Sequence, residues 1–435
     1  MQLSVIGSGY VGTTVAACFA DCGHDVVNVD LADDIVDDIN DGTAPIHEDG
    51  LQELIDEHAG PGSTGRLRAT TDYDAVLDTE LTMLCLPTPQ NEDGSIDLSV
   101  MEGGARTLGE TLREKSGRHV VVVKSTVVPK STVDVIGPTI AEAAGKELGE
   151  QLGIGMNPEF LREGSAVDDF LSPDKLVLGA EDERTLAAMR ELFDPVADRA
   201  GDPPIVTTDT KTAEMMKYAN NAFLASKVSI ANDLGNICKA FDIDMYEVAD
   251  AMGLDSRIER SFLDSGLGWG GSCFPKDTNA IIAAGREHEY EPPLLDAAVR
   301  VNEDQPRRFL RLLDRHVDVE GERVAVLGLA FKPGTDDIRN SRAIPVIEGL
   351  IDRGAHVVAH DPAASERMRD RFSAIEYARR PEEALAGADA CLVVTDWAEY
   401  AALNEEFDAM STPVVIDGRH CIERRDGLVY EGLTW

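Results

Sequence analysis

The chain has 435 residues, of which 43% are hydrophobic, so it is long enough for two to three folded domains. Its 80 Asp and Glu against 40 Lys and Arg give a net charge of −40. This charge argues against nucleic acid or anionic membranes as partners of the general surface. No apolar run reaches the roughly 18 residues of a membrane span. The first residues, MQLSVI, lack the layout of a signal peptide, which predicts a cytoplasmic protein.

The basic residues are also unevenly divided. The chain contains 11 Lys, which leaves 40 − 11 = 29 Arg. An acidic, lysine-poor surface on a folded chain favours an organism with a very salty cytoplasm, and we expect a halophilic archaeon. At about 1 M salt the Debye length is only ~3 Å, so the self-repulsion is largely screened. The alternative is an ordinary acidic enzyme.

The chain begins with the pattern of a nucleotide-binding α/β unit. Residues 2–6 (QLSVI) predict a strand, GSGYVG a glycine turn, TTVAACFADCG a helix, and residues 26–30 a second strand. Further apolar runs alternate with helical patterns at 81–86, 120–123 and 176–178. This rhythm predicts a doubly wound parallel sheet over residues 1–207.

The middle and the end of the chain have different textures. Residues 210–241 carry apolar positions at helical spacing and predict one long helix, with further helices to about residue 302. At residue 323 the α/β pattern restarts, with predicted strands at RVAVLGLAF, 356–360, 391–395 and 414–417 and a helix at 343–352. We therefore predict an α/β protein with two Rossmann-like doubly wound parallel-sheet domains, 1–207 and 317–435, joined by an all-helical region, 208–316.

A dinucleotide site is predicted at the first glycine turn. Gly7, Gly9 and Gly12 fit Gly-x-Gly-x-x-Gly, which gives a tight turn, a close approach to a pyrophosphate and close helix packing. Asp30 ends the second predicted strand, where a carboxylate can bind a ribose diol. Leu31 and Ala32 follow it instead of an arginine, which favours NAD over NADP. The alternative is a purely structural glycine turn.

The segment GLGWGGSCFPKDT (266–278) predicts a reactive thiol. Pro275 fits the first position of a helix, which places Cys273 just before a helix N-terminus and beside Lys276. Both features lower the pKa of a thiol and favour the thiolate nucleophile. Asp277 lies four residues further on and can face the same side. The alternative is a buried cysteine at a glycine-rich turn.

The other six cysteines are predicted to be inert packing residues: Cys18, Cys22, Cys85, Cys238, Cys391 and Cys421. No paired metal-ligand spacing such as CxxC occurs among the seven, and we predict no metal site.

Two further segments carry polar residues that suit catalysis. Lys217 and Asn221 in KYANN are four apart, so they share a helix face on which they could stabilise an oxyanion. Glu159 and Glu163 in NPEFLREG follow a predicted strand, GIGM. Taken alone, each pair is also compatible with a solvated helix face or loop, and these alternatives stay open at the level of the residues.

Seven motifs, in order, give the chain a resemblance to a known family. GSGYVG, LPTP, VKSTVVP, NPEFLREG, KYANN, GGSCFPKD and FKPGTDDIRNS together resemble the UDP-glucose/GDP-mannose dehydrogenase family, and within it the UDP-glucose 6-dehydrogenases. The resemblance implies a four-electron oxidation with two NAD⁺, in which a sugar C6 alcohol becomes an aldehyde, then a cysteine thiohemiacetal and thioester, and finally a uronate.

The resemblance also implies roles for individual residues. Cys273 would be the nucleophile, Lys217 and Asn221 the oxyanion-stabilising groups, Glu159 and Asp277 the groups that handle water and protons, and Thr126 a residue that positions the water. The cofactor would be held by Gly7, Gly9, Tyr10, Val11, Gly12, Asp30, Thr88, Ser125, Glu163, Lys276 and Arg339. The sugar nucleotide would be held by Phe160, Leu161, Arg257, Phe262, Gly270, Lys332 and Arg419.

The implied partners are a UDP-sugar and a second copy of the chain. The long helix would form the core of a homodimer, and Arg257 would reach the site of the partner subunit. Ser272 stands where the N-acetylmannosamine branch of the family has a histidine, which favours glucose, with GDP-mannose as the alternative. A two-electron oxidoreductase with a structural Cys273 and an NAD-sensing protein without chemistry are the competing hypotheses.

Overall fold

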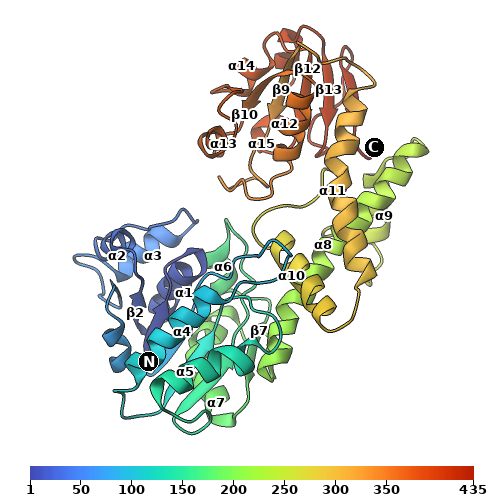
Figure 1. Cartoon of the computed structure of the whole chain (residues 1–435). Coiled ribbons are helices and arrows are strands. Elements are labelled where there is room, and N and C mark those ends of the chain that lie inside the picture. The colour runs from blue at the N-terminus through green and yellow to red at the C-terminus, as the bar shows by residue number, and fades with distance from the viewer. The chain divides into compact units, whose positions relative to one another are not determined.

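The structure is a computed structural model that describes all residues from 1 to 435 (Figure 1). Its contacts divide the chain into two compact units, Met1–Ala219 and Asn220–Trp435. The long helix α8 (Thr210–Ala240) contributes residues to both units. The three-domain division at 207/208 and 316/317 stays a prediction. No helix has the length and apolar character needed to cross a bilayer.

The first unit is built on an eight-stranded sheet in the order β3-β2-β1-β4-β5-β6-β7-β8. Its central strands are rich in valine and buried on both faces, as parallel strands between helices require. The strands are β1 (Gln2–Ile6), β2 (Asp25–Val29), β3 (Leu67–Thr70), β4 (Leu81–Leu84), β5 (His119–Val123), β6 (Leu152–Met156), β7 (Leu176–Ala180) and β8 (Ile205–Thr208).

Helices cover both faces of this sheet. Leu3 and Val5 of β1 belong to one hydrophobic core and Ile6 to another, so the strand alternates between two packed layers. The helices are α1 (Tyr10–Asp21), α2 (Asp33–Asn40), α3 (Leu51–His58), α4 (Ser99–Leu112), α5 (Gly137–Ala144), α6 (Ala166–Leu171) and α7 (Glu183–Ala200), with short helical turns at Tyr73–Asp78 and Thr132–Ile136.

One strand pair departs from the predicted parallel order. β6 and β7 run antiparallel, with Met156 opposite Gly179, whereas every other pair in the sheet is parallel. An antiparallel return needs no crossover helix. The connection is therefore free to hold a long loop and the six-residue helix α6. That loop carries the NPEFLREG motif.

The second unit combines helices with a six-stranded parallel sheet in the order β11-β10-β9-β12-β13-β14. The helical part contains α9 (Met245–Gly253), α10 (Phe274–Glu287) and α11 (Pro293–Leu313) after α8. The strands are β9 (Arg323–Leu327), β10 (His356–His360), β11 (Glu376–Tyr377), β12 (Ala390–Val393), β13 (Val414–Asp417) and β14 (Val429–Gly432). The remaining helices are α12 (Ala343–Asp352), α13 (Ser365–Arg371), α14 (Pro381–Leu385) and α15 (Ala398–Ala401), with a helical turn at Glu405–Ala409.

Candidate functional site

The glycine turn of the first unit has the geometry of a dinucleotide site. Gly7 has φ +97°, and a Cβ on Gly12 would lie 1.9 Å from the carbonyl oxygen of Gly7, so neither position accepts a side chain. A Cβ on Gly9 would meet nothing within 4 Å, so the backbone there is open to a ligand. Tyr10 and Val11 follow at the start of α1, whose first N–H groups lack partners within the helix.

Asp30 lies next to this turn, at the end of β2. Its Oδ2 accepts from the Ser8 amide at 2.6 Å and its Oδ1 from the Ala32 amide at 3.0 Å. A carboxylate has about four acceptor positions, so two remain for a ribose diol. The prediction that Asp30 stands beside the glycine turn is therefore consistent with the geometry of the first unit.

The ends of β4 and β5 bring two predicted cofactor residues to the same edge of the sheet. The Thr88 hydroxyl donates to the carbonyl of Thr126 at 3.0 Å, and the Ser125 hydroxyl donates to the carbonyl of Leu86 at 2.6 Å. These contacts bind the LPTP and VKST segments to each other. The carboxyl edge of parallel strands is where ligands bind in such folds.

A buried ion pair follows at the neighbouring strand end. The Lys217 ammonium of α8 lies 2.9 Å from Glu159 Oε1, and Glu159 Oε2 accepts from the Leu161 amide at 2.7 Å. Burial alone would raise the pKa of Glu159, but Lys217, Lys124 and the Leu161 amide together lower it. Glu159 is therefore ionised at neutral pH and can accept a proton.

A second lysine supports this centre. Lys124 is buried and donates to Asn157 Oδ1 at 2.7 Å. Burial lowers the pKa of Lys124 to about 8, although Glu159 opposes the shift. Its role was not assigned from the sequence beyond its position in a motif.

The loop after Glu159 presents the predicted sugar-binding positions. Phe160 and Leu161 are half-buried, and the Phe160 ring lies 4.3 Å from the Lys175 ammonium and 5.6 Å from that of Lys217. Cation–π contacts of this kind fix the ring. The backbone of the loop is thereby held beside the Glu159 and Lys217 pair. Glu163 is half-buried further along the same loop.

In the second unit, Cys273 is the N-cap residue of α10. It is the exposed member of the seven cysteines; Cys18, Cys85 and Cys391 are buried, and the remaining three are partly buried. Burial raises the pKa of the Cys85 thiol to about 12, which keeps that group neutral and inert. The helix begins at Phe274, so Pro275 is its second residue and not its first.

Three polar side chains gather one turn beyond the thiol. The buried Asp277 accepts from Asn221 Nδ2 at 2.6 Å and pairs with the Lys276 ammonium at 2.9 Å. The Asp277 amide donates to the Cys273 carbonyl at 2.8 Å, as one turn of helix requires. The KYANN and SCFPKD motifs, which are 56 residues apart at this contact, are therefore brought together.

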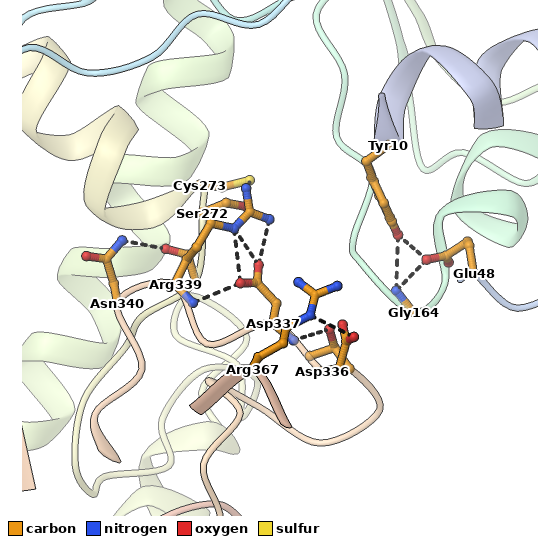
Figure 2. Close-up of polar contacts among 12 residues, drawn as sticks. Tyr10, Glu48, Gly164, Ser272, Cys273, Asp336, Asp337, Arg339, Asn340 and Arg367 are labelled. Atoms are coloured by element: carbon orange, nitrogen blue, oxygen red, sulfur yellow. Dashed lines mark hydrogen bonds and ion pairs between the residues drawn. The ribbon is translucent and has the colours of Figure 1, made fainter. Parts of the chain in front are cut away.

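The glycines before Cys273 pack against the FKPGTDDIRNS segment. A Cβ on Gly270 would lie 2.3 Å from the Asn340 carbonyl oxygen, and one on Gly271 would lie 2.8 Å from the Phe331 ring. The Gly271 amide donates to the Arg339 carbonyl at 2.9 Å, and Asn340 Nδ2 donates to the Gly271 carbonyl at 3.0 Å. Figure 2 shows Asn340 and Arg339 beside the loop that carries Ser272 and Cys273.

The predicted cations of the second unit are held in place by neighbours. The Arg339 guanidinium contacts Asp337 through three N–H···O contacts of 2.6 to 3.0 Å. Asp337 was missed in the sequence; its position two residues before the arginine is the signal that could have found it. Lys332 lies 5.7 Å from the Phe331 ring. Arg419 Nε donates to the Val394 carbonyl at 2.7 Å.

Two predicted sugar-binding residues lie further out. Arg257 is exposed and pairs with Asp255, with Nη2 at 2.6 Å from Oδ2. Phe262 has φ +63° and its ring lies 6.5 Å from that of Phe274. Each unit therefore brings its own set of predicted residues together: the dinucleotide turn and the Glu159 and Lys217 pair in one, and the thiol, Asp277 and the Arg339 segment in the other.

The sequence matches a known family along almost its whole length. Residues 1–197, 211–304 and 325–424 match the NAD binding domain, the central domain and the UDP binding domain of the UDP-glucose/GDP-mannose dehydrogenase family. The chain belongs to the UDP-glucose/GDP-mannose dehydrogenase family. It is thus an NAD-binding oxidoreductase, and the predicted family, cofactor and fold class are confirmed. The open backbone at Gly9 and the free lone pairs of Asp30 fit that cofactor.

Three relatives within the UDP-glucose/GDP-mannose dehydrogenases narrow the comparison. The UDP-glucose 6-dehydrogenase AglM of Haloferax volcanii is 64% identical over 434 residues, covering 100% of both chains. The GDP-mannose 6-dehydrogenase of Pseudomonas aeruginosa is 38% identical over 382 residues, covering 87% of this chain and 83% of its own. The structure of a UDP-glucose dehydrogenase from Pyrobaculum islandicum aligns with TM-score 0.93 at 41% identity, covering 100% and 98%. The first relative agrees with the predicted halophilic archaeal source.

Proposed function

We propose that the enzyme oxidises the C6 alcohol of UDP-glucose to the carboxylate of UDP-glucuronate with two NAD⁺. The observation that carries the chemistry is the placement of Cys273 as an exposed N-cap, one turn from the Asn221 and Asp277 pair. The substrate rests on the 64% identity to a protein named UDP-glucose 6-dehydrogenase over the full length of both chains.

The proposed chemistry uses Cys273 to retain the intermediate. NAD supplies a hydride acceptor in each of the two oxidations. The Cys273 sulfur adds to the aldehyde carbon and forms a C–S bond, which gives a thiohemiacetal whose oxidation leaves a thioester. Water then cleaves the C–S bond, the acyl group leaves as the carboxylate, and the thiol is regenerated. Retaining the aldehyde on sulfur prevents its release.

Side chains of this chain are proposed to handle charge and protons in these steps. Lys217 and Asn221, one turn apart on α8, would stabilise the oxyanions by charge and by an amide donor. Glu159 would accept the proton of the attacking water, because its lowered pKa keeps it ionised. Asp277 would orient water, and Thr126 would position it. The lower-lying roles of Lys332, Phe262 and Arg419 are contacts to the sugar nucleotide.

A homodimer is part of the proposal. Beyond Asn220, α8 exposes a row of apolar side chains at seven-residue spacing, with exposed fractions of 70% for Phe223, 59% for Ile230 and 52% for Ile237. A repeat of seven keeps one face of a helix toward a partner helix. We expect this face to bury against a second copy, with the exposed Arg257 reaching the partner's site. Sedimentation of Ile230→Asp should then show monomers, and an unchanged dimer would contradict the assignment.

The substrate is tested by a panel of UDP- and GDP-sugars at high KCl, with NADH formation as the readout. The proposal expects UDP-glucose to give the highest kcat/KM. A higher kcat/KM for GDP-mannose would replace the substrate while keeping the chemistry. No turnover with any sugar nucleotide, despite NAD binding, would leave a binding protein without chemistry. A cytoplasmic location remains part of the prediction.

A further inference from the structure

A buried carboxylate lies between two motifs of the first unit. Glu48 belongs to the loop between α2 and α3 and is 5% exposed. Its Oε1 accepts from the Ala166 amide at 2.6 Å, and its Oε2 accepts from the Gly164 amide at 2.8 Å. The Tyr10 hydroxyl donates a further hydrogen bond to Oε2, and the Gly164 amide also reaches the Tyr10 oxygen at 3.1 Å. Figure 2 shows the three groups converging.

The donors come from two segments that are far apart in the sequence. Tyr10 is the first residue of α1 and directly follows Gly9, the open position of the dinucleotide turn. Gly164 ends the NPEFLREG motif, and Ala166 begins α6. The other end of that motif carries Glu159, which is paired with Lys217. One carboxylate therefore links the turn that holds the cofactor to the loop that holds the proposed base.

The chemistry of the contact requires an acceptor on both oxygens. Two backbone N–H groups and one hydroxyl donate, so a carboxylate satisfies all three, whereas an amide would direct its own N–H₂ at one of them. Burial, followed by the hydrogen bond to Glu48, raises the pKa of Tyr10. The hydroxyl thus keeps its proton and stays a donor at every pH at which the protein is folded.

We propose that Glu48 is a positioning residue that couples occupancy of the dinucleotide turn to the register of the 157–166 loop. A shift of Tyr10 on cofactor binding is transmitted through the carboxylate to Gly164 and Ala166, and so along the loop to Glu159. The cofactor arm rests on the family's NAD-binding domain, and the effect on turnover rests on the proposed function.

The test compares Glu48→Gln with Asp49→Asn, an exposed neighbour in the same loop. NADH affinity is measured by fluorescence at high KCl without any sugar nucleotide, so a wrong substrate assignment leaves this arm readable. Loss of one charge-assisted hydrogen bond predicts a roughly tenfold rise in Kd for NADH and a fall of similar size in kcat for Glu48→Gln. Asp49→Asn should change both by less than about twofold.

Thermal unfolding of the same variants separates positioning from structural support. A staple without function would lower the unfolding temperature of Glu48→Gln but leave its Kd for NADH and its kcat unchanged well below that temperature. That result would overturn the proposal.

A double-mutant cycle with Tyr10→Phe tests the coupling itself. If both residues act through one contact, the double variant should raise the Kd for NADH no more than Glu48→Gln alone. Strictly additive effects of the two substitutions on Kd would show that Tyr10 and Glu48 act independently, and the coupling would be wrong.

Discussion

The two sheets of this protein start with the same turn and use it differently. Gly7 after β1 and Gly328 after β9 both have φ +97°, and the amide of each donates to the last residue of the neighbouring strand. The strand order around them is also shared, with the second strand and then the third on one side and the fourth on the other. The topology alone therefore does not decide which sheet holds the dinucleotide.

The difference lies in the aspartate that faces each turn. Asp30 is half-buried and accepts from two amides. Asp361, at the same place after β10, is 4% exposed, and it accepts from the amides of Leu329, Ala330, Ala363 and Ala364 and from the Trp397 indole. The lone pairs of Asp361 are used by the fold, whereas Asp30 keeps some for a ligand.

The segment after each turn differs in the same sense. In the first unit α1 begins at Tyr10, which presents helix N–H groups to a pyrophosphate. In the second unit, residues 329–342 intervene before α12, and they carry Lys332, Asp337 and Arg339 onto the glycines beside Cys273. One sheet thus uses its turn for a cofactor and the other uses it to hold a loop against the nucleophile.

The largest expected effect separates the two units by chemistry. Replacing Cys273 with Ser should lower kcat by at least about 10⁴-fold, since removal of a nucleophile has effects of this size. NADH affinity should stay within about twofold of the original, because the dinucleotide turn lies in the other unit. Steady-state turnover with UDP-glucose and NADH fluorescence give the two readouts. Retained turnover would remove Cys273 from the mechanism.

The paired aspartates give the next largest contrast. Asp361→Ala should lower the free energy of unfolding by about 3–5 kcal/mol, because several buried backbone donors lose a charged acceptor. Asp30→Ala should instead raise the KM for NAD⁺ roughly tenfold with about 1 kcal/mol loss of stability, as expected for a ribose contact. Denaturant titrations and NAD⁺ kinetics measure both. Equal destabilisation by the two substitutions would erase the comparison.

A carboxylate used by the fold of the first unit predicts a pH effect on stability. Glu214 of α8 is buried and accepts from the amides of Lys130 and Thr132, and burial raises its pKa to about 6. The folded state then binds more protons than the unfolded state between pH ~4.5 and ~6, so this contribution to stability is full below pH ~4.5 and is lost as the pH rises through ~6.

The change amounts to about 2 kcal/mol. It should appear as a decline of wild-type stability relative to Glu214→Gln when unfolding is followed from pH 4.5 to 6.5 at fixed KCl. A difference between the two proteins that does not vary with pH would show that Glu214 is ionised throughout.

The smallest effect concerns the surface that both units share. With a net charge of −40, dilute buffer should raise the KM for NAD⁺ several-fold and lower stability, because repulsion of anionic ligands and self-repulsion are then unscreened. Kinetics from 0.1 to 3 M KCl test this. Activity that is unchanged in dilute buffer would show that the acidic surface is not an adaptation to salt.

Local patterns predicted much of the fold. The strands at 2–6 and 414–417 and the helix at 343–352 match β1, β13 and α12, and the helix at 210–241 is confirmed within one residue as α8. Each of these elements is encoded by its own periodicity. The antiparallel pairing of β6 with β7 was not predicted, because strand direction depends on contacts between segments that the pattern of a single strand does not contain.

The site divides in the same way. Cys273 at a helix N-terminus and the glycine turn could be read from neighbouring residues, and Asp277 from its spacing of four. Glu48 and Asp361 could not, because each is defined by amides from loops that only the fold brings to it. A carboxylate in a polar loop looks solvated until its donors are known. The site residues as a set stay predictions until ligands are bound.

The most direct test of the account is the ratio of NADH formed to sugar nucleotide oxidised. With limiting UDP-glucose and excess NAD⁺ at high KCl, absorbance of NADH and chromatography of the nucleotide product are measured together. The account predicts two NADH for each UDP-glucuronate and no free aldehyde. One NADH for each molecule consumed, with the aldehyde accumulating, would contradict it and leave Cys273 as a structural residue of a two-electron oxidoreductase.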